Sequence, residues 1–116
     1  MSEKTTLYHL DTLIGFVGDD PDAIQNMVRI FMQTTPELLE TINECFKQNY
    51  SEELSKAAHS IKPTLDVFGI DKLHATIRKI EQKSRDEELD SEMVALINEL
   101  NTVLEDVFKA LRDKYL

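Results

Sequence analysis

Glycine, proline, cysteine and tryptophan are scarce in this chain of 116 residues, which holds three Gly, three Pro, one Cys and no Trp. Gly and Pro together usually supply about 12% of a protein, so their scarcity argues against a turn-rich β-sandwich or barrel. A single cysteine, Cys45, excludes an internal disulfide framework. The length suits one compact domain with a substantial core. We therefore expect one domain over residues 1–116, with residues 1–6 as a flexible start.

Long hydrophobic runs are also missing. The longest apolar runs are a few residues, whereas a membrane-spanning helix requires about 18. The first residues, 1–6, carry no apolar run of the kind found in signal peptides. We therefore expect no membrane partner and, with a single cysteine, a cytoplasmic location.

Positive charge is in short supply, because 13 Lys and Arg against 22 Asp and Glu give a net charge of −9. Such an acidic chain is not expected to bind nucleic acid or anionic membranes. Residues 54–85 differ from the rest, with seven Lys and Arg against three Asp and Glu. A site within this segment would lie in a locally basic region.

Apolar residues recur at helical spacing along the whole chain, without an internal repeat or a low-complexity segment. The pattern predicts helices over about residues 7–17, 21–49, 51–68, 71–85 and 91–111. The connections are short, which favours antiparallel neighbours. The predicted fold is therefore all-α, an antiparallel four-helix bundle with a short extra N-terminal helix across one end. An open helical array is the alternative.

Several residues are placed to begin or end these helices. Asp20, Ser51 and Asp71 are predicted to act as N-caps, because their side-chain oxygens can accept from free backbone N–H groups. Gly69 is predicted to end the helix that begins near residue 51. Lys83, Arg85 and the acidic residues 86–88 are expected to mark the polar end of the fourth helix, and the acidic run is interpreted as a solvated helix end.

Two prolines fall inside predicted helices. Pro36 is expected to end or kink the helix that starts at Pro21. Pro63 has no N–H to donate to the carbonyl oxygen of His59, four residues earlier, so the third helix is expected to bend or loosen there.

Familiar catalytic and metal-binding motifs do not occur. The glycines are too far apart for a phosphate-binding loop, and the GxSxG, HExxH and CxxC patterns are all missing. We therefore expect no ATP site, no kinase activity and no metal site. Cys45 is interpreted as a small, partly buried apolar residue rather than a reactive thiol.

His59 is the strongest candidate for a functional residue. At about 100° per residue, the apolar stripe of its helix is centred about 150° away from it, so the imidazole should face solvent. Its neighbours on the helix surface are Ser55, Lys56, Lys62 and Asp66. A neutral, exposed imidazole is a nucleophile, and the two lysines lie within reach to balance the charge of a phosphoryl group bound to it. Taken alone, this geometry is more typical of an ordinary surface histidine than of a functional one. His9 and His74 are expected to be structural, with His74 at the rim of the core.

The residues around His59 resemble the signature of the histidine phosphotransfer (HPt) domain family. That signature has a small residue before the histidine, an apolar residue two positions after it, a lysine three after and a glycine ten after. The matching residues here are Ala58, Ile61, Lys62 and Gly69, and the later pair Ile80-Glu81 resembles the end of the family's next helix. The upstream segments 18–21 and 35–39 also resemble the family, so that the resemblance covers about residues 7–115.

The resemblance implies a phosphorelay intermediate. Such a domain accepts a phosphoryl group on its histidine from an aspartate of a response-regulator receiver domain, or from a hybrid histidine kinase, and passes it to another receiver. It has no ATP site of its own, and the receiver supplies Mg²⁺, so no cofactor is expected. The locally basic segment 54–85 would suit an acidic partner. We expect the protein to be a monomer.

The resemblance also implies roles for individual residues. His59 is the expected phosphoacceptor, Lys62 is expected to offset phosphoryl charge, and Lys56 is a weaker candidate for the same task. Glu81 is expected to orient the imidazole ring. Gly69 is expected to keep side chains from protruding at the surface. Pro63 stands where the family usually has glycine, which bears on partner choice. The remaining candidates for docking or support are Ser55, Asp66, and the apolar Leu10, Leu13 and Ile14.

Two other functions stay open at this point. A helical adaptor with the same fold would bind receiver or kinase domains without being phosphorylated. An enzyme using His59 as a general base would need a concave pocket and a second catalytic group.

Overall fold

The computed structural model describes residues 7–116, and over this range every regular element is a helix. The predicted flexible start, residues 1–6, lies outside the described residues. The elements are α1 (Asp11–Val17), α2 (Pro21–Lys47), α3 (Ser51–Val67), the 3₁₀ turn η1 (Asp71–Leu73), α4 (His74–Arg85) and α5 (Ser91–Tyr115).

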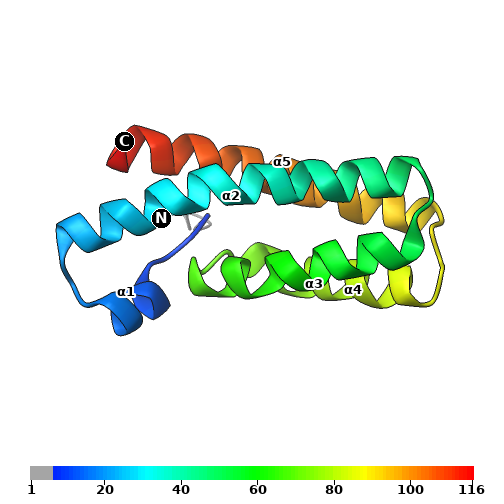
Figure 1. Cartoon of the computed structure of the whole chain (residues 1–116), viewed down its shortest axis with the longest axis horizontal. Coiled ribbons are helices and arrows are strands. Elements are labelled where there is room, and N and C mark those ends of the chain that lie inside the picture. Colours follow the sequence, from blue (N-terminus) through cyan, green and yellow to red (C-terminus); the bar gives the residue numbers. More distant parts are fainter. Residues whose placement is uncertain (1–6) are drawn as a thin grey trace, which may run out of the picture.

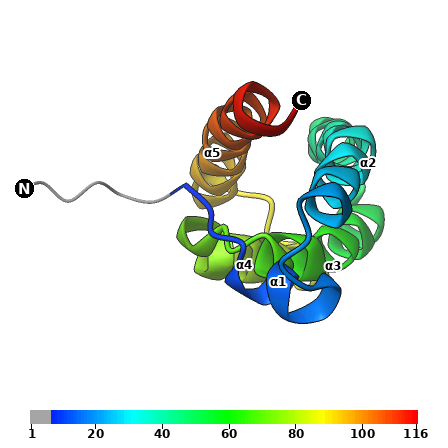
Figure 2. The same ribbon diagram turned by 90° about the vertical axis from the view of Figure 1, so that its left-hand side faces the viewer.

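The four long helices form an antiparallel bundle, as Figure 1 shows. Around the bundle, α2 packs on α3, α3 on α4, α4 on α5, and α5 again on α2. The short α1 lies across one end, against α2 and α3 (Figure 2). The predicted all-α bundle with an extra N-terminal helix is therefore confirmed.

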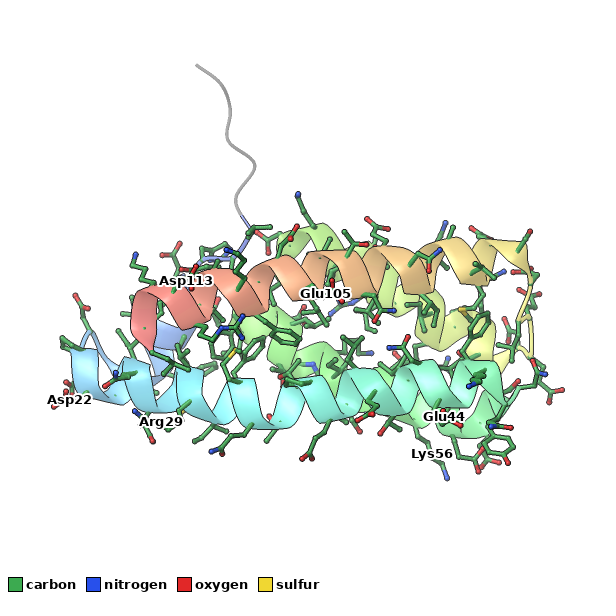
Figure 3. The ribbon with its side chains drawn as sticks, turned by 90° about the horizontal axis from the view of Figure 1, so that it is seen from above. Asp22, Arg29, Glu44, Lys56, Glu105 and Asp113 are labelled. Atoms are coloured by element: carbon green, nitrogen blue, oxygen red, sulfur yellow. The ribbon has the colours of Figure 1, made fainter. Side chains whose placement is uncertain are left out.

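A continuous apolar core holds the helices together. Every apolar position predicted for α3 is buried, which leaves the opposite side of that helix free for polar side chains. The buried positions are Leu54, Ala58, Ile61, Leu65 and Phe68. Charged side chains such as Glu44 on α2, and Glu105 and Asp113 on α5, point outward (Figure 3).

The ends of the helices differ in places from the sequence-based expectation. Asp20 caps α2 by accepting from the N–H of Asp22 at 3.1 Å, as predicted. Ser51 does not cap α3, because the N-cap position is Tyr50 and carries no side-chain hydrogen bond. Asp71 opens a 3₁₀ turn rather than capping an α-helix. The first α-helix begins at Asp11, so the segment before it is not helical.

Both internal prolines lie within unbroken helices. Helix α2 continues through Pro36 to Lys47, so the alternative in which Pro36 ends the helix is wrong. A proline removes one hydrogen bond, and the residues on both sides of Pro36 are held by burial of Phe31, Leu39 and Ile42. Helix α3 likewise continues through Pro63; the predicted bend there stays a prediction.

Gly69 ends α3 in the left-handed conformation, with φ of 61°. The N–H of Gly69 donates to the carbonyl of Asp66, and the N–H of Ile70 donates to that of Leu65, so the last turn of α3 is closed. A Cβ atom on Gly69 would collide with the backbone oxygen and the ring of His9. Gly69 is therefore buried beneath the N-terminal segment. The expectation that it lies at an open surface, where it would keep side chains from protruding, is wrong.

We expect Gly69→Ala to lower the free energy of unfolding by about 1–2 kcal/mol from the left-handed backbone alone, and further through the contact with His9. Urea denaturation of the purified variant measures the change. Gly15→Ala is the matched control, because nothing lies within 4 Å of its Cβ position, and alanine in a helix should raise stability by up to about 1 kcal/mol. Equal effects of the two substitutions would contradict this account.

Candidate functional site

His59 lies on the solvent side of α3. Its side chain is 70% exposed, whereas the neighbouring Ala58 and Ile61 are fully buried. The orientation inferred from helical periodicity is therefore correct. An imidazole in this position is accessible to a macromolecular partner.

A buried carboxylate from the facing helix holds the ring of His59. The Oε2 atom of Glu81, on α4, lies 2.9 Å from Nδ1 of His59. The Nζ of Lys62 donates to the other oxygen, Oε1, at 2.7 Å. Arg85 lies one helical turn after Glu81 and brings its Nη2 atom within 3.2 Å of Oε2. Glu81 is only 6% exposed. From this buried position, its carboxylate contacts His59, Lys62 and Arg85.

The charge state of Glu81 determines which atom donates the hydrogen bond between Glu81 and His59. Burial raises the pKa of Glu81, but the hydrogen bonds to Lys62 and His59 and the positive charge of Lys62 outweigh burial, so the pKa lies below its usual value. Glu81 is therefore ionised near neutral pH and can only accept hydrogen bonds. It follows that Nδ1 of His59 carries a hydrogen and donates it. In the neutral ring, Nε2 then holds the free lone pair.

The two predicted lysines occupy different environments. Lys62 is 25% exposed and is held by Glu81 next to the histidine. Lys56 is 75% exposed and forms an ion pair with Glu52 at 3.5 Å, toward the start of α3. Lys62 therefore belongs to the network around His59, whereas Lys56 lies beside it.

The other sequence-based candidates, Ser55 and Asp66, lie on the same helix as His59 and form no hydrogen bond with it. Asp66 binds Arg78 at 2.7 Å and lies 3.6 Å from the ring of His74, linking α3 to α4. His74 is itself exposed, so its expected place at the rim of the core is wrong. Ser55 lines a polar pocket between α3 and α4 together with Arg85.

Arg85 is the residue at this site whose role the sequence did not reveal. The sequence places Arg85 only at the polar end of a helix, yet its Nη2 atom lies 3.2 Å from Oε2 of Glu81. The signal was available, since residues four apart on a helix are neighbours. The sequence did not show that Glu81 is buried and therefore in need of positive partners.

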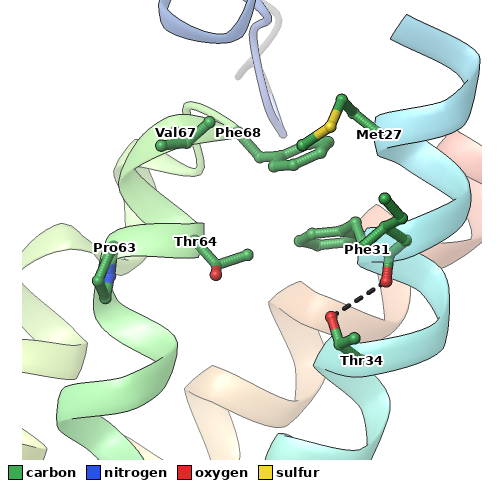
Figure 4. A pocket seen from close by; sticks show the side chains of 8 residues that line it. Met27, Phe31, Thr34, Pro63, Thr64, Val67 and Phe68 are labelled. Carbon is green, nitrogen blue, oxygen red and sulfur yellow. Dashed lines mark hydrogen bonds between the residues drawn. The ribbon is translucent and has the colours of Figure 1, made fainter. Parts of the chain in front are cut away.

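An apolar groove between α2 and α3 begins one turn along α3 from His59 (Figure 4). Its volume is about 210 Å³, and its lining residues are Met27, Ile30, Phe31, Thr34, Pro63, Thr64, Val67 and Phe68. The apolar docking surface expected from Leu10, Leu13 and Ile14 is not formed as such. Leu13 is buried and the other two are partly buried against the core, because α1 turns this face inward.

Within residues 7–116, no group of three or more His, Cys, Asp or Glu is placed to hold a metal ion. None of the helices in the described part of the chain is long and apolar enough to cross a membrane.

A comparison with family models matches residues 26–114 to the Hpt domain. Neither the curated proteins nor the solved structures gave a match. The matched range contains His59, Lys62, Glu81 and Arg85, and it covers the four helices of the bundle apart from residues 21–25 of α2 and Tyr115 at the end of α5. Hpt domains are phosphocarrier modules of two-component phosphorelays that interact with receiver domains and kinases, and are not themselves kinases. The chain belongs to the Hpt domain family.

Proposed function

We propose that this protein is a phosphorelay intermediate and that Nε2 of His59 carries the phosphoryl group. One observation supports the assignment above the others. An exposed imidazole has its Nδ1 held at 2.9 Å by an ionised carboxylate, so its nucleophilic nitrogen faces solvent. The donor is the phosphoaspartate of a receiver domain, either free or part of a hybrid kinase, and the acceptor is another receiver.

The transfer step requires no proton to leave the site. The Nε2 lone pair of His59 attacks the phosphorus atom, and the bond from phosphorus to the receiver's aspartate breaks with its electron pair on the carboxylate. The ring keeps its hydrogen on Nδ1 and becomes positively charged as the N–P bond forms. Glu81 faces this N–H and is suited to stabilise the developing charge. In the reverse direction, a receiver aspartate attacks and the neutral ring leaves.

Lys62 is suited to stabilise the phosphoryl group itself. Its ammonium and the histidine ring share one carboxylate, so Lys62 can turn from Glu81 toward a phosphoryl group on Nε2. Positioning and charge stabilisation account for most of the catalysis of phosphoryl transfer. The receiver supplies Mg²⁺ in this proposal, and the chain needs no cofactor.

Surface charge and shape support an acidic receiver as the partner. The segment 54–85 that carries the site is basic in an otherwise acidic chain, which favours encounter with an acidic pocket. The apolar groove between α2 and α3, whose lining includes Phe31 and Val67, offers an apolar contact beside the site. We propose a monomer acting in the cytoplasm, with this face open to the receiver.

The assay mixes the purified chain with receiver domains from its source organism, each phosphorylated by a small phosphodonor in the presence of Mg²⁺. We expect an acid-labile, base-stable phosphate on the chain, as is characteristic of phosphohistidine. Mass spectrometry of peptides then locates it. Absence of such a phosphate with every receiver contradicts the proposed relay function.

We expect Lys62→Ala to slow phosphoryl transfer by roughly 100-fold, the lower end of the typical loss when one charge-stabilising donor is removed from a reacting group. Single-turnover transfer from a phosphorylated receiver measures the rate constant. Lys56→Ala is the matched control, since Lys56 lies on the same helix but pairs with Glu52. An equal loss in both variants would indicate a general charge effect and remove the specific role of Lys62.

A further inference from the structure

Pro63 occupies the surface immediately next to the phosphoacceptor. It lies in α3 four residues after His59, and it is exposed. One turn of helix advances about 5.4 Å, so the proline ring and the imidazole lie on nearly the same face of α3. The ring replaces a backbone N–H by a rigid hydrocarbon surface.

The same residue forms part of the α3 wall of the apolar groove (Figure 4). Thr64 and Val67 continue this wall, and Met27, Ile30 and Phe31 face it from α2. Ile30 is 42% exposed, which is unusual for a large aliphatic residue in this protein. Pro63 thus connects the reactive site to the groove.

Transfer requires any receiver to cover Pro63. The reacting atoms must come within about 3–3.5 Å of each other and in line. A receiver that brings its aspartate to Nε2 of His59 therefore places its own surface over the next turn of α3. The shape and polarity of that turn must match the receiver.

We propose that Pro63 is a specificity-determining residue that selects among receivers. A receiver that presents an aliphatic side chain beside its phosphoaspartate contacts the proline ring and enters the groove. A receiver with a polar or bulky group at that position meets the ring, which can neither hydrogen-bond nor move aside. This inference rests on the proposed function and concerns the choice of partner, not the chemistry at His59.

Competition between receivers tests the inference. The value of kcat/KM for transfer to or from each receiver of the panel is measured for the native chain, Pro63→Gly and Pro63→Ala. We expect Pro63→Gly to change the ratio between the preferred receiver and the next one by about tenfold or more, since a few methylenes in an apolar contact give discrimination of this order. Pro63→Ala should change it less, because it keeps one methyl group.

Two readouts separate selection from other effects. Phosphorylation of His59 by phosphoramidate, a small donor that needs no docking, should stay within about twofold in both variants, because Pro63 takes no part in the chemistry. Circular dichroism checks the fold, which alanine at this position favours. Val94→Ala, an exposed apolar change on α5, is the matched control and should leave the ratio unchanged.

An unchanged ratio between receivers in Pro63→Gly overturns the inference. So does an equal change in the rate with phosphoramidate, because the effect then acts on His59 rather than on the partner. If the native chain accepts phosphate from no receiver, the proposed function fails instead. The two failures are therefore distinguishable.

Discussion

His59→Gln is expected to abolish phosphorylation of the chain while leaving its fold intact. Glutamine has no ring nitrogen to form the N–P bond, and the side chain at this position is 70% exposed, so little packing is lost. Incubation with a phosphorylated receiver should label the native chain and leave the variant unlabelled. Thermal unfolding should show nearly the same Tm for both.

His74→Gln is the matched control, because His74 is also largely exposed, on α4. It should be phosphorylated at the native rate. Label that persists on His59→Gln would exclude His59 as the acceptor. If receivers bind the native chain and His59→Gln equally well and neither becomes labelled, the protein is an adaptor rather than a phosphate carrier.

Glu81→Ala is expected to reduce the rate of transfer by roughly 10- to 100-fold, as is common when a partner that orients a reactive imidazole is removed. The substitution frees the ring of His59 and releases Lys62 from its 2.7 Å contact. The transfer rate of Glu81→Gln should lie between those of the native chain and Glu81→Ala. The amide oxygen of glutamine can still accept a hydrogen bond from Nδ1 of His59, but it carries no charge to stabilise the cationic ring. Single-turnover kinetics with one receiver measures all three proteins.

Glu92→Gln serves as the control, since Glu92 is on α5 and pairs with Lys79 and Lys83 away from His59. It should transfer at the native rate. If Glu81→Ala also transfers at the native rate, the ring needs no orienting carboxylate and the proposed mechanism is wrong.

The carboxylate of Glu81 should make the free energy of unfolding depend on pH. The pKa of Glu81 in the folded state lies below its usual value, because its bonds to Lys62 and His59 outweigh burial. A group of this kind stabilises the fold fully above its unfolded pKa of about 4.5. That stabilisation is lost as the pH falls through the lower folded pKa. Urea unfolding between pH 6 and pH 3 should therefore show a steeper loss for the native chain than for Glu81→Gln.

The chain's periodicity predicted which side of each helix is buried. On α3 the stripe from Leu54 to Phe68 was found buried and His59 was found exposed, because both depend only on rotation about one helix axis. The apolar spacing predicted helices, the scarcity of glycine and proline argued against a β-sandwich or barrel, and short turns predicted antiparallel packing. These features are local, so the sequence alone determines them.

Contacts between helices could not be derived in the same way. The sequence predicted Lys83 only as part of a polar helix end, whereas it is 9% exposed and pairs with Glu88, Asp90 and Glu92. The turn from α4 to α5 and the start of α5 bring these carboxylates next to the ammonium group of Lys83. A helical pattern does not show which residues a loop brings together.

The sequence by itself determined the all-α bundle, the outward position of His59 and, through its resemblance to a family, the residues worth examining. Only the tertiary structure decided that Glu81 is buried under His59, that Lys62 and Arg85 share this carboxylate, and that Gly69 lies beneath His9. The reason is physical. Helix propensity and amphipathic spacing act within a single helix, whereas these contacts depend on how far one helix is shifted and rotated against the next.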